Sequence, residues 1–400
     1  MIWTLILMAV STAPDAPEAS IRAERASYVQ GEPIGMLVTI RNPGPRAIEV
    51  VTHYPNEPVL KLEPAGGGAP KRRPVEWGAY SGPPLERTIE SGASWDLTLY
   101  WPLTVEPPAP GPQRLRASCH VAWRDADKRE RLYLRAIGEV AFDVTPRDAD
   151  RLASIYDRYA KAEADEDRDD PWPSETAHAA LDSVRDPAVI PWLARLLDHA
   201  ALLSDGYVPI DKFRDIEAAR LALTKLVRTG DPERTPWALG RLGEWGHHLA
   251  VEDIRPFLAS ADVWLRSRAL GYLKKVRDDR YRALRPEVAR LAEADATADA
   301  MPALAVLGIW AEAKGPVPGR LTRAVAGLDA AKDDDVRLVL DAAAVWRHDI
   351  GGPTLRRLLA TPKLASANGY EVAAYAEAMG RADYQDLARQ AQGTDPAPAK

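Results

Sequence analysis

PFLASADVWLRSRALGYLKKV, residues 256–276, is the stretch that decides the fold of the C-terminal half of this chain. After Asp262, apolar residues recur at spacings of three and four, which is the period of one helix face. An aspartate before such a run accepts hydrogen bonds from the free N–H groups of the first helical turn. The stretch therefore predicts an amphipathic helix that begins at Asp262 and turns a small Ala269 and a large Leu273 toward its neighbours.

The same pattern recurs along the chain. It starts at Asp215, Asp262, Asp299 and Asp335, so that successive starts are 47, 37 and 36 residues apart. The seventh residue after each start is small or β-branched and the eleventh is large: Ala222, Ala269, Val306 and Ala342, then Leu226, Leu273, Trp310 and Trp346. Turn sequences such as Asp231-Pro232 introduce a partner helix, because proline suits a first helical turn. A repeated helix–turn–helix unit is predicted.

Two stretches of this region resemble HEAT repeats. They are residues 186–199 (DPAVIPWLARLLDH), with the internal Pro191, and residues 256–276, with the spacing of Asp262 and Arg266. The resemblance implies a HEAT-like α-α superhelix over residues 174–392, with a TPR-like or irregular helical array as the alternative. Stacked repeats of this kind present extended surfaces to partners. Residues 393–400 are expected to form a disordered tail.

Upstream of the helices, between Ile21 and Val144, the apolar period is two. Two runs show it most clearly: Met36, Val38 and Ile40, and Ala117, Cys119 and Val121. This alternation is typical of strands with one buried face. About seven such strands, separated by turns rich in proline and glycine, predict a β-sandwich.

The strand region is similar to bacterial Ig-like domains. The resemblance lies in Tyr28, in Gly31-Glu32-Pro33-Ile34 and in the following Val38–Gly44 segment (VTIRNPG). It implies an Ig-like β-sandwich over residues 19–146 and no particular activity. The predicted fold class is therefore multidomain, all-β plus all-α, with an Ig-like β-sandwich followed by a HEAT-like α-α superhelix. Residues 147–173 are expected to form a helical and acidic junction.

The first residues predict export. Ile2–Val10 is an apolar run too short to span a bilayer and similar to the core of a secretory signal. We expect residues 1–13 to be a signal peptide and the protein to be periplasmic or extracellular, without a membrane span once the signal is removed. A mis-set start codon or a buried first strand is the alternative.

Composition limits the function. The net charge of −6 does not supply the positive field that nucleic acids require. Cys119 is the only cysteine, so a disulfide within the chain is excluded. Nucleophile-elbow, zinc-helix, phosphate-loop and kinase signatures are absent from the sequence. We expect no enzyme activity and no cofactor.

Two groups of residues are candidates for a metal or catalytic site. Asp165, Asp167 and Asp169 have the opening spacing of a calcium loop but lack its glycine and its final glutamate, so a solvated charge run is the better interpretation. Glu244, His247 and His248 could cluster near a helix end, and they are the candidates if the helices serve a lyase or a modifying enzyme.

Candidate partner contacts lie in two places. One is the loop of residues 64–90, where exposed aromatic side chains stand beside basic ones, and the other is the helix after Asp262. The candidates are Arg72, Arg73, Trp77, Tyr80, Trp264 and Arg266. The predicted function is a non-catalytic exported binding or scaffold protein that presents its helical surface to a protein partner. The alternatives are proteinase-inhibitor-like or glycan-binding activity of the Ig-like domain.

Overall fold

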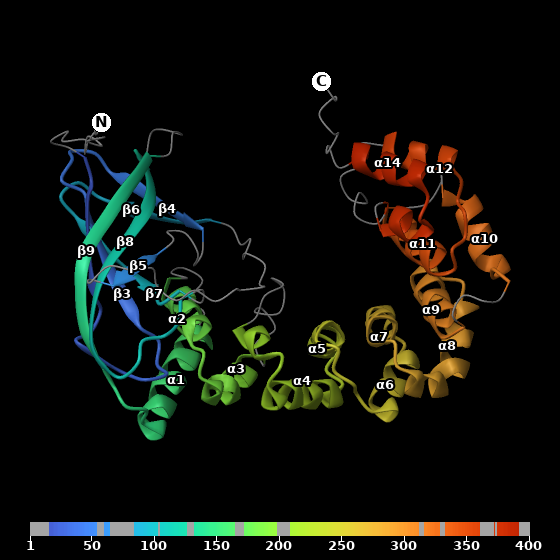
Figure 1. Ribbon diagram of the computed structural model, residues 1–400, viewed down its shortest axis with the longest axis horizontal. Coiled ribbons are helices and arrows are strands. Elements are labelled where there is room, and N and C mark those ends of the chain that lie inside the picture. Colours follow the sequence, from blue (N-terminus) through green and yellow to red (C-terminus); the bar gives the residue numbers. More distant parts are fainter. Residues whose placement is uncertain are drawn as a thin grey trace, which may run out of the picture. The chain divides into compact units, whose positions relative to one another are not determined.

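The computed structural model describes residues 16–53, 60–64, 84–102, 105–125, 132–164, 172–197, 209–311, 316–328, 333–360, 372 and 374–391. Sheets and helices are both present, which confirms the predicted mixture of β and α structure (Figure 1). The chain divides into two compact units, Met1–Ala219 and Arg220–Lys400. All of the described strands belong to the first unit, and the described part of the second unit is helical.

The strands of the first unit form two sheets. They are β1 (Glu18–Ala23), β2 (Ser27–Val29), β3 (Gly35–Arg41), β4 (Ile48–His53), β5 (Lys61–Pro64), β6 (Pro84–Ile89), β7 (Ser94–Tyr100), β8 (Gly111–Asp125) and β9 (Leu132–Thr145). One sheet has the order β1-β3-β7, with antiparallel pairs. The other has the order β2-β9-β8-β4-β6, in which β2 runs parallel to β9 and β5 also pairs with β8.

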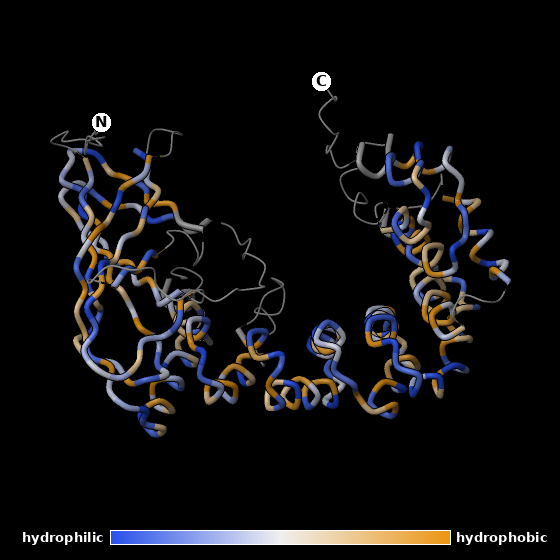
Figure 2. Tube along the Cα trace, in the orientation of Figure 1, coloured by the Kyte–Doolittle hydropathy of each residue, from blue (hydrophilic) through white to orange (hydrophobic). Residues whose placement is uncertain are grey.

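Both sheets contribute side chains to one hydrophobic core. Met36, Val38 and Ile40 of β3 are fully buried, and Cys119 of β8 is 1% exposed. Their neighbours in sequence are more exposed, so the predicted alternation of buried and exposed positions is confirmed. Figure 2 shows the same alternation of hydrophobic and hydrophilic residues along the strands.

Helices pack against these sheets within the first unit. They are α1 (Ala149–Ala164), α2 (Trp172–Ser183), η1 (Pro187–Val189), α3 (Ile190–Leu196) and η3 (Pro209–Phe213). The Tyr156 hydroxyl of α1 donates to the Gly31 carbonyl oxygen at 2.7 Å, and the Arg147 Nε donates to Asp186 at 2.8 Å. Gly31 has a φ of +105°, and a Cβ atom there would lie 2.8 Å from the Asp186 carboxylate. Glycine is needed at this turn for both reasons.

The second unit stacks its helices in two layers. Its elements are most of α4 (Glu217–Thr229), α5 (Arg234–Glu244), α6 (Val251–Leu258), α7 (Val263–Val276), η4 (Asp279–Leu284), α8 (Arg285–Ala292), α9 (Thr297–Trp310), α10 (Gly319–Ala326), α11 (Asp333–Val345), α12 (Gly352–Ala360) and α14 (Ala382–Ala391). Contacts between α5 and α7, α7 and α9, and α9 and α11 make one layer. Helices α6, α8 and α10 make the second layer, in which α6 packs against α7, α8 against α9 and α10 against α11 (Figure 1).

The helical pattern predicted from the four aspartates is met in part. The large positions Leu226, Leu273, Trp310 and Trp346 are at most 9% exposed. Asp262 caps α7, because its carboxylate accepts from the Trp264 N–H at 2.8 Å. Asp299 does not cap α9: the helix begins at Thr297, and Asp299 is 3% exposed. The cap prediction is wrong there because the Asp299 carboxylate binds Arg266 of α7 instead.

A second repeat, which the sequence analysis missed, fixes the turns after α5 and α11. Each turn holds a tryptophan, a histidine and an aliphatic residue at alternate positions: Trp245, His247 and Leu249, then Trp346, His348 and Ile350. In the first turn, the Tyr272 hydroxyl donates to the His247 carbonyl oxygen and accepts from the Leu249 N–H, both at 2.7 Å. Tyr375 makes the same two bonds in the second turn, at 2.9 and 3.0 Å. These histidines therefore shape turns through their backbone.

Candidate binding surface on the helical array

Trp264 and Arg268 form an exposed aromatic and cationic pair on α7. They are four residues apart, so both side chains project from the same side of the helix. The guanidinium carbon of Arg268 lies 4.1 Å from the centre of the Trp264 ring. The tryptophan is nevertheless 53% exposed. A large apolar ring with a polar rim that is left half in water is the kind of group that gains most from being covered by a partner.

Trp237 and Arg241 repeat this arrangement on the neighbouring α5. The Arg241 guanidinium carbon lies 5.7 Å from the centre of the Trp237 ring. Glu244, one turn further on, accepts from Arg241 at 3.0 Å and from Lys275 of α7 at 2.9 Å, which ties the two helices together. We call the following residues together the α5–α7 face: Trp237, Gly240, Arg241, Glu244, Trp264, Arg268 and Lys275.

Gly240 of α5 lies close to Arg268 in this face. A Cβ atom at Gly240 would lie 3.7 Å from Nη1 of Arg268, which is ordinary van der Waals contact. The guanidinium of α7 therefore reaches across to the backbone of α5, the helix that carries Trp237.

Arg268 differs electrostatically from the other cations of the face. Within the described part of the chain no hydrogen bond or ion pair is made by its guanidinium, and its Nε is buried without an acceptor. Burial lowers the pKa of Arg268 from its ordinary value, and the neighbouring cations Arg337 and Arg241 lower it further against the attraction of Glu244. Half-burying a cation beside like charges is unfavourable until an anion joins it.

The face is equipped for binding more than for acid–base chemistry. Burial by itself would raise the pKa of Glu244, but its hydrogen bonds and ion pairs with Lys275 and Arg241 outweigh burial and lower it. A carboxylate held ionised in this way is a weak proton acceptor at neutral pH. Tryptophan and arginine, in contrast, are the residues most enriched among those that dominate protein interfaces.

Arg266, which the sequence put forward as a partner contact, is occupied within the chain. Its guanidinium donates to both carboxylate oxygens of Asp299, at 2.9 and 2.6 Å. It also donates to the backbone carbonyl oxygens of Ser260 and Ala261, at 2.7 and 2.8 Å. With its side chain only 14% exposed, Arg266 holds the turn between α6 and α7 onto α9.

Several sequence candidates lie outside the described residues. They are the loop candidates Arg72, Arg73, Trp77 and Tyr80, the signal at residues 1–13, and Asp165, Asp167 and Asp169. The proteinase-inhibitor-like and glycan-binding alternatives for the Ig-like domain stay predictions.

Glu244, His247 and His248 are near in sequence but do not converge on one point. His247 Nε2 lies 3.3 Å from the Thr224 hydroxyl, and His248 Nδ1 lies 3.0 Å from Asp278. Glu244 faces Lys275 instead. In the described residues no group of three or more histidine, cysteine, aspartate or glutamate side chains is placed to hold a metal ion.

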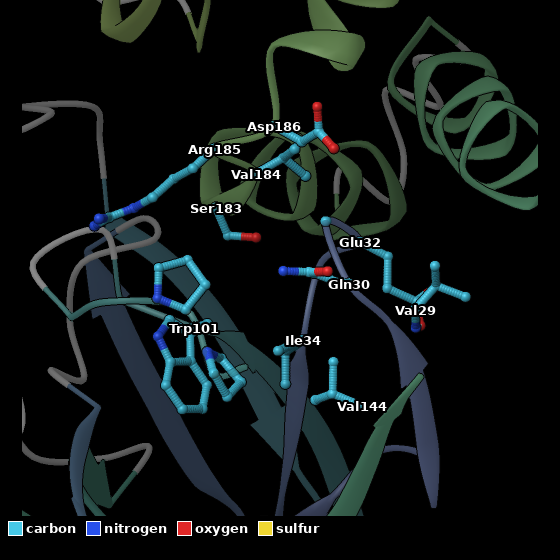
Figure 3. A pocket seen from close by; sticks show the side chains of 13 residues that line it. Val29, Gln30, Glu32, Ile34, Trp101, Val144, Ser183, Val184, Arg185 and Asp186 are labelled. Carbon is cyan, nitrogen blue, oxygen red and sulfur yellow. The ribbon is translucent and has the colours of Figure 1, made fainter. Parts of the chain in front are cut away.

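A small recess lies between the sheets and the helices of the first unit. Figure 3 shows Trp101 and Ile34 on its sheet side and Ser183 and Val184 on its helix side. Its volume is about 50 Å³. That is room for a few water molecules, well short of a metabolite-sized site.

Ionisable groups also gather around α2 in the first unit. Nδ1 of His178 lies 2.7 Å from Oε1 of Glu163 of α1. Lys212 of η3 donates to the carbonyl oxygens of Leu181 and Asp182, at 2.8 and 2.6 Å. The side chains of Glu163 and Lys212 are 1% and 6% exposed. We interpret these contacts as internal ties that join α1, α2 and η3.

Sequence reasoning named Trp264 but missed Arg268, Trp237 and Arg241. The signal was present, because tryptophan is followed by arginine four residues later in both α5 and α7. That spacing puts the two side chains on one side of a helix, whereas Arg266, two residues after Trp264, points away from it. The approach of Arg268 to α5 could not be found in this way, since it depends on how α5 and α7 pack.

Comparisons with known proteins do not identify a family. Neither the family models nor the curated proteins gave a match. Among solved structures, the crystal structure of Salmonella alpha-2-macroglobulin reacted with methylamine aligns at 12% sequence identity with a TM-score of 0.24. The alignment covers 95% of this chain and 26% of that one, so the chain spans about a quarter of that protein's length. At this level the likeness supports no conclusion about fold or function.

Within the described ranges, no helix combines the length and the apolar character needed to cross a bilayer.

Proposed function

We propose that this protein is an exported, non-catalytic binding or scaffold protein that presents the α5–α7 face to a partner protein. In this proposal the two sheets are an Ig-like β-sandwich that docks or spaces the array, and the helices form a HEAT-like superhelix. Export rests on the apolar run Ile2–Val10. The observation that carries the binding role is the stacked but 53% exposed Trp264.

The energetic reason is the area that the face leaves in contact with water. Covering apolar surface is worth roughly 25 cal/mol per Å², and an aromatic side chain buries about 150–250 Å² in all. Covering the exposed half of the Trp264 side chain would therefore contribute on the order of 2 kcal/mol to binding. Trp237, which is partly buried, belongs to α5, the helix packed against α7, and a partner that covers both helices would reach it too.

The test is affinity capture by the full-length protein from an envelope fraction and from culture supernatant. The wild type is compared with Trp264→Ala and with Tyr133→Ala. Tyr133 of β9 is a matched control, because it is an aromatic residue that is 71% exposed and belongs to the other unit. The captured protein is identified and then purified, and its affinity for each variant is measured by calorimetry.

The proposal expects a partner whose affinity falls about tenfold or more with Trp264→Ala and stays unchanged with Tyr133→Ala. A partner that binds both variants equally well would remove the α5–α7 face from the proposal. Absence of any partner from both fractions would count against the binding role itself.

A further inference from the structure

The cations around the α5–α7 face differ in whether they contact a carboxylate. Arg241 and Lys275 each pair with Glu244, and Lys274 of α7 donates to both carboxylate oxygens of Asp341 of α11, at 2.7 and 2.6 Å. Arg268 makes no hydrogen bond or ion pair with a carboxylate among the described residues, and Glu244 attracts it only from a distance. In the described part of the face, Arg268 is therefore the cation without a carboxylate in contact.

The Arg268 guanidinium is stacked on an aromatic ring. Trp264 covers one side of the guanidinium, and Nη1 lies beside the backbone of Gly240 on α5. A planar guanidinium offers two parallel N–H donors, which match the two oxygens of a carboxylate. Stacking on the indole limits the freedom of the arginine side chain, so less conformational entropy is lost when an anion binds.

We infer that Arg268 is the anion receptor of the α5–α7 face, and that its ligand is a carboxylate side chain in an acidic segment of the partner protein. The inference rests on the proposed function and deepens it, because it names the chemistry that the partner must present. Apolar side chains of the same segment cover Trp264 and Trp237 on either side of the carboxylate.

The spacing of this motif follows from the packing of the helices. Neighbouring helices lie about 8–10 Å apart, and an extended peptide rises about 3.3 Å per residue. An extended segment that crosses from Trp264 to Trp237 therefore spans about three residues. Because only alternate side chains of an extended segment face the same surface, the expected motif is two apolar residues four positions apart, with an acidic residue midway between them.

A peptide carboxylate fits better than the phosphates of a nucleic acid. Phosphate backbones are bound by many cations acting together. Here Arg241 and Lys275 already contact Glu244, Lys274 contacts Asp341, and the whole chain carries a net charge of −6. One guanidinium without a carboxylate in contact, stacked on an aromatic ring, matches one carboxylate flanked by apolar groups.

The experiment uses the full-length protein and fluorescein-labelled peptides. The acidic probe holds two leucines four positions apart, with glutamate between and around them. The neutral probe has glutamine and the basic probe has lysine in place of each glutamate. Binding is measured by fluorescence anisotropy at low and at physiological salt, for the wild type, Arg268→Gln, Arg268→Lys and Arg323→Gln. Arg323 is the matched control, an exposed arginine on α10 in the other layer of the same unit.

We expect the acidic probe to bind the wild type and Arg323→Gln alike and to bind Arg268→Gln about tenfold or more weakly. Arg268→Lys should lie between, because lysine keeps the charge and loses the paired donors. The neutral and basic probes should bind weakly to every variant. Thermal unfolding should show that Arg268→Gln is folded, since the substitution removes a cation that makes no hydrogen bond or ion pair with the described residues.

Three results would overturn the inference. The first is equal binding of the acidic probe to the wild type and Arg268→Gln, or no binding to either. The second is equal binding of the neutral probe. The third is that heparin or single-stranded DNA competes more strongly than the acidic peptide does, which would make the ligand a polyanion of another class. A captured partner that depends on Trp264 but tolerates Arg268→Gln would leave the proposed function standing and remove only this inference.

Discussion

Replacing Asp299 with alanine should destabilise the helical array strongly. The Asp299 carboxylate is 4% exposed and accepts two hydrogen bonds from the Arg266 guanidinium, which is itself 14% exposed. Removal of one partner of a buried ion pair leaves the other charge buried without compensation, which costs about 3–5 kcal/mol. Arg266 keeps its two bonds to the backbone of Ser260 and Ala261, so it cannot easily swing into solvent.

The variants separate charge from packing. Asp299→Asn keeps one acceptor for the guanidinium and should cost less than Asp299→Ala. The double variant Arg266→Met, Asp299→Leu removes both charges and should recover part of the loss, because apolar residues often replace a buried ion pair without destabilisation. Asp279→Ala is the matched control: Asp279 pairs with Arg282 at 3.0 Å, but the two side chains are 80% and 48% exposed. Its loss should change stability little.

The assay combines urea unfolding with hydrogen exchange. Urea midpoints report the free energy of unfolding, and hydrogen exchange followed by mass spectrometry reports which helices open. Asp299→Ala should lower the midpoint of the transition that includes α7 and α9 and should speed exchange in both helices. If Asp299→Ala costs no more than Asp279→Ala, the Arg266–Asp299 pair does not hold the array together and the argument from burial is wrong.

Three further predictions concern single residues. Burial lowers the pKa of Lys212 to about 8, below the 10.5 of an unfolded lysine. Between these two pH values the unfolded chain binds more protons than the folded chain, so the free energy of unfolding of the wild type should rise with pH across that window. Lys212→Met should lack this rise when urea unfolding is measured at each pH. Burial raises the pKa of Cys119 to about 11, so this thiol should resist a disulfide reagent at pH 8 in the folded protein and react quickly in urea, and rapid reaction without urea would contradict the buried position. Gly308→Ala should destabilise by about 1–3 kcal/mol, because its Cβ would lie 2.8 Å from Nε1 of Trp346, whereas Gly271→Ala, which meets nothing within 4 Å, should stabilise α7 by up to about 1 kcal/mol in thermal unfolding.

The sequence predicted what depends on local periodicity. The alternation in β3 and β8 and the buried large positions Leu273 and Trp346 follow from which side of a strand or helix a residue occupies. Asp299 shows where that reasoning stops. In the sequence it has the same place as Asp262, but α9 begins two residues earlier and Arg266 reaches it from another helix. A contact between helices is decided by packing, and local spacing does not contain it.

The candidate surface also combines features that follow from local spacing with features that follow from helix packing. Trp264 can be predicted as an aromatic residue in an amphipathic helix. Arg268 follows it by four residues, and this spacing is enough to predict that the two side chains lie on the same side of the helix. That Arg268 contacts no carboxylate among the described residues could not be foreseen, because the neighbouring Glu244 binds Arg241 and Lys275 instead.

The contact between Tyr156 and Gly31 determines where the chain can be cut for separate study. A fragment that stops after β9 would lose the tyrosine hydroxyl that the Gly31 carbonyl accepts from and would uncover the apolar residues Ile34 and Trp101 that line the recess. Such a fragment should be prone to self-association for reasons unrelated to any natural partner. Since α4 itself runs through the boundary at Ala219, a fragment that keeps every described element of the first unit whole ends beyond Thr229, at the Gly230 turn.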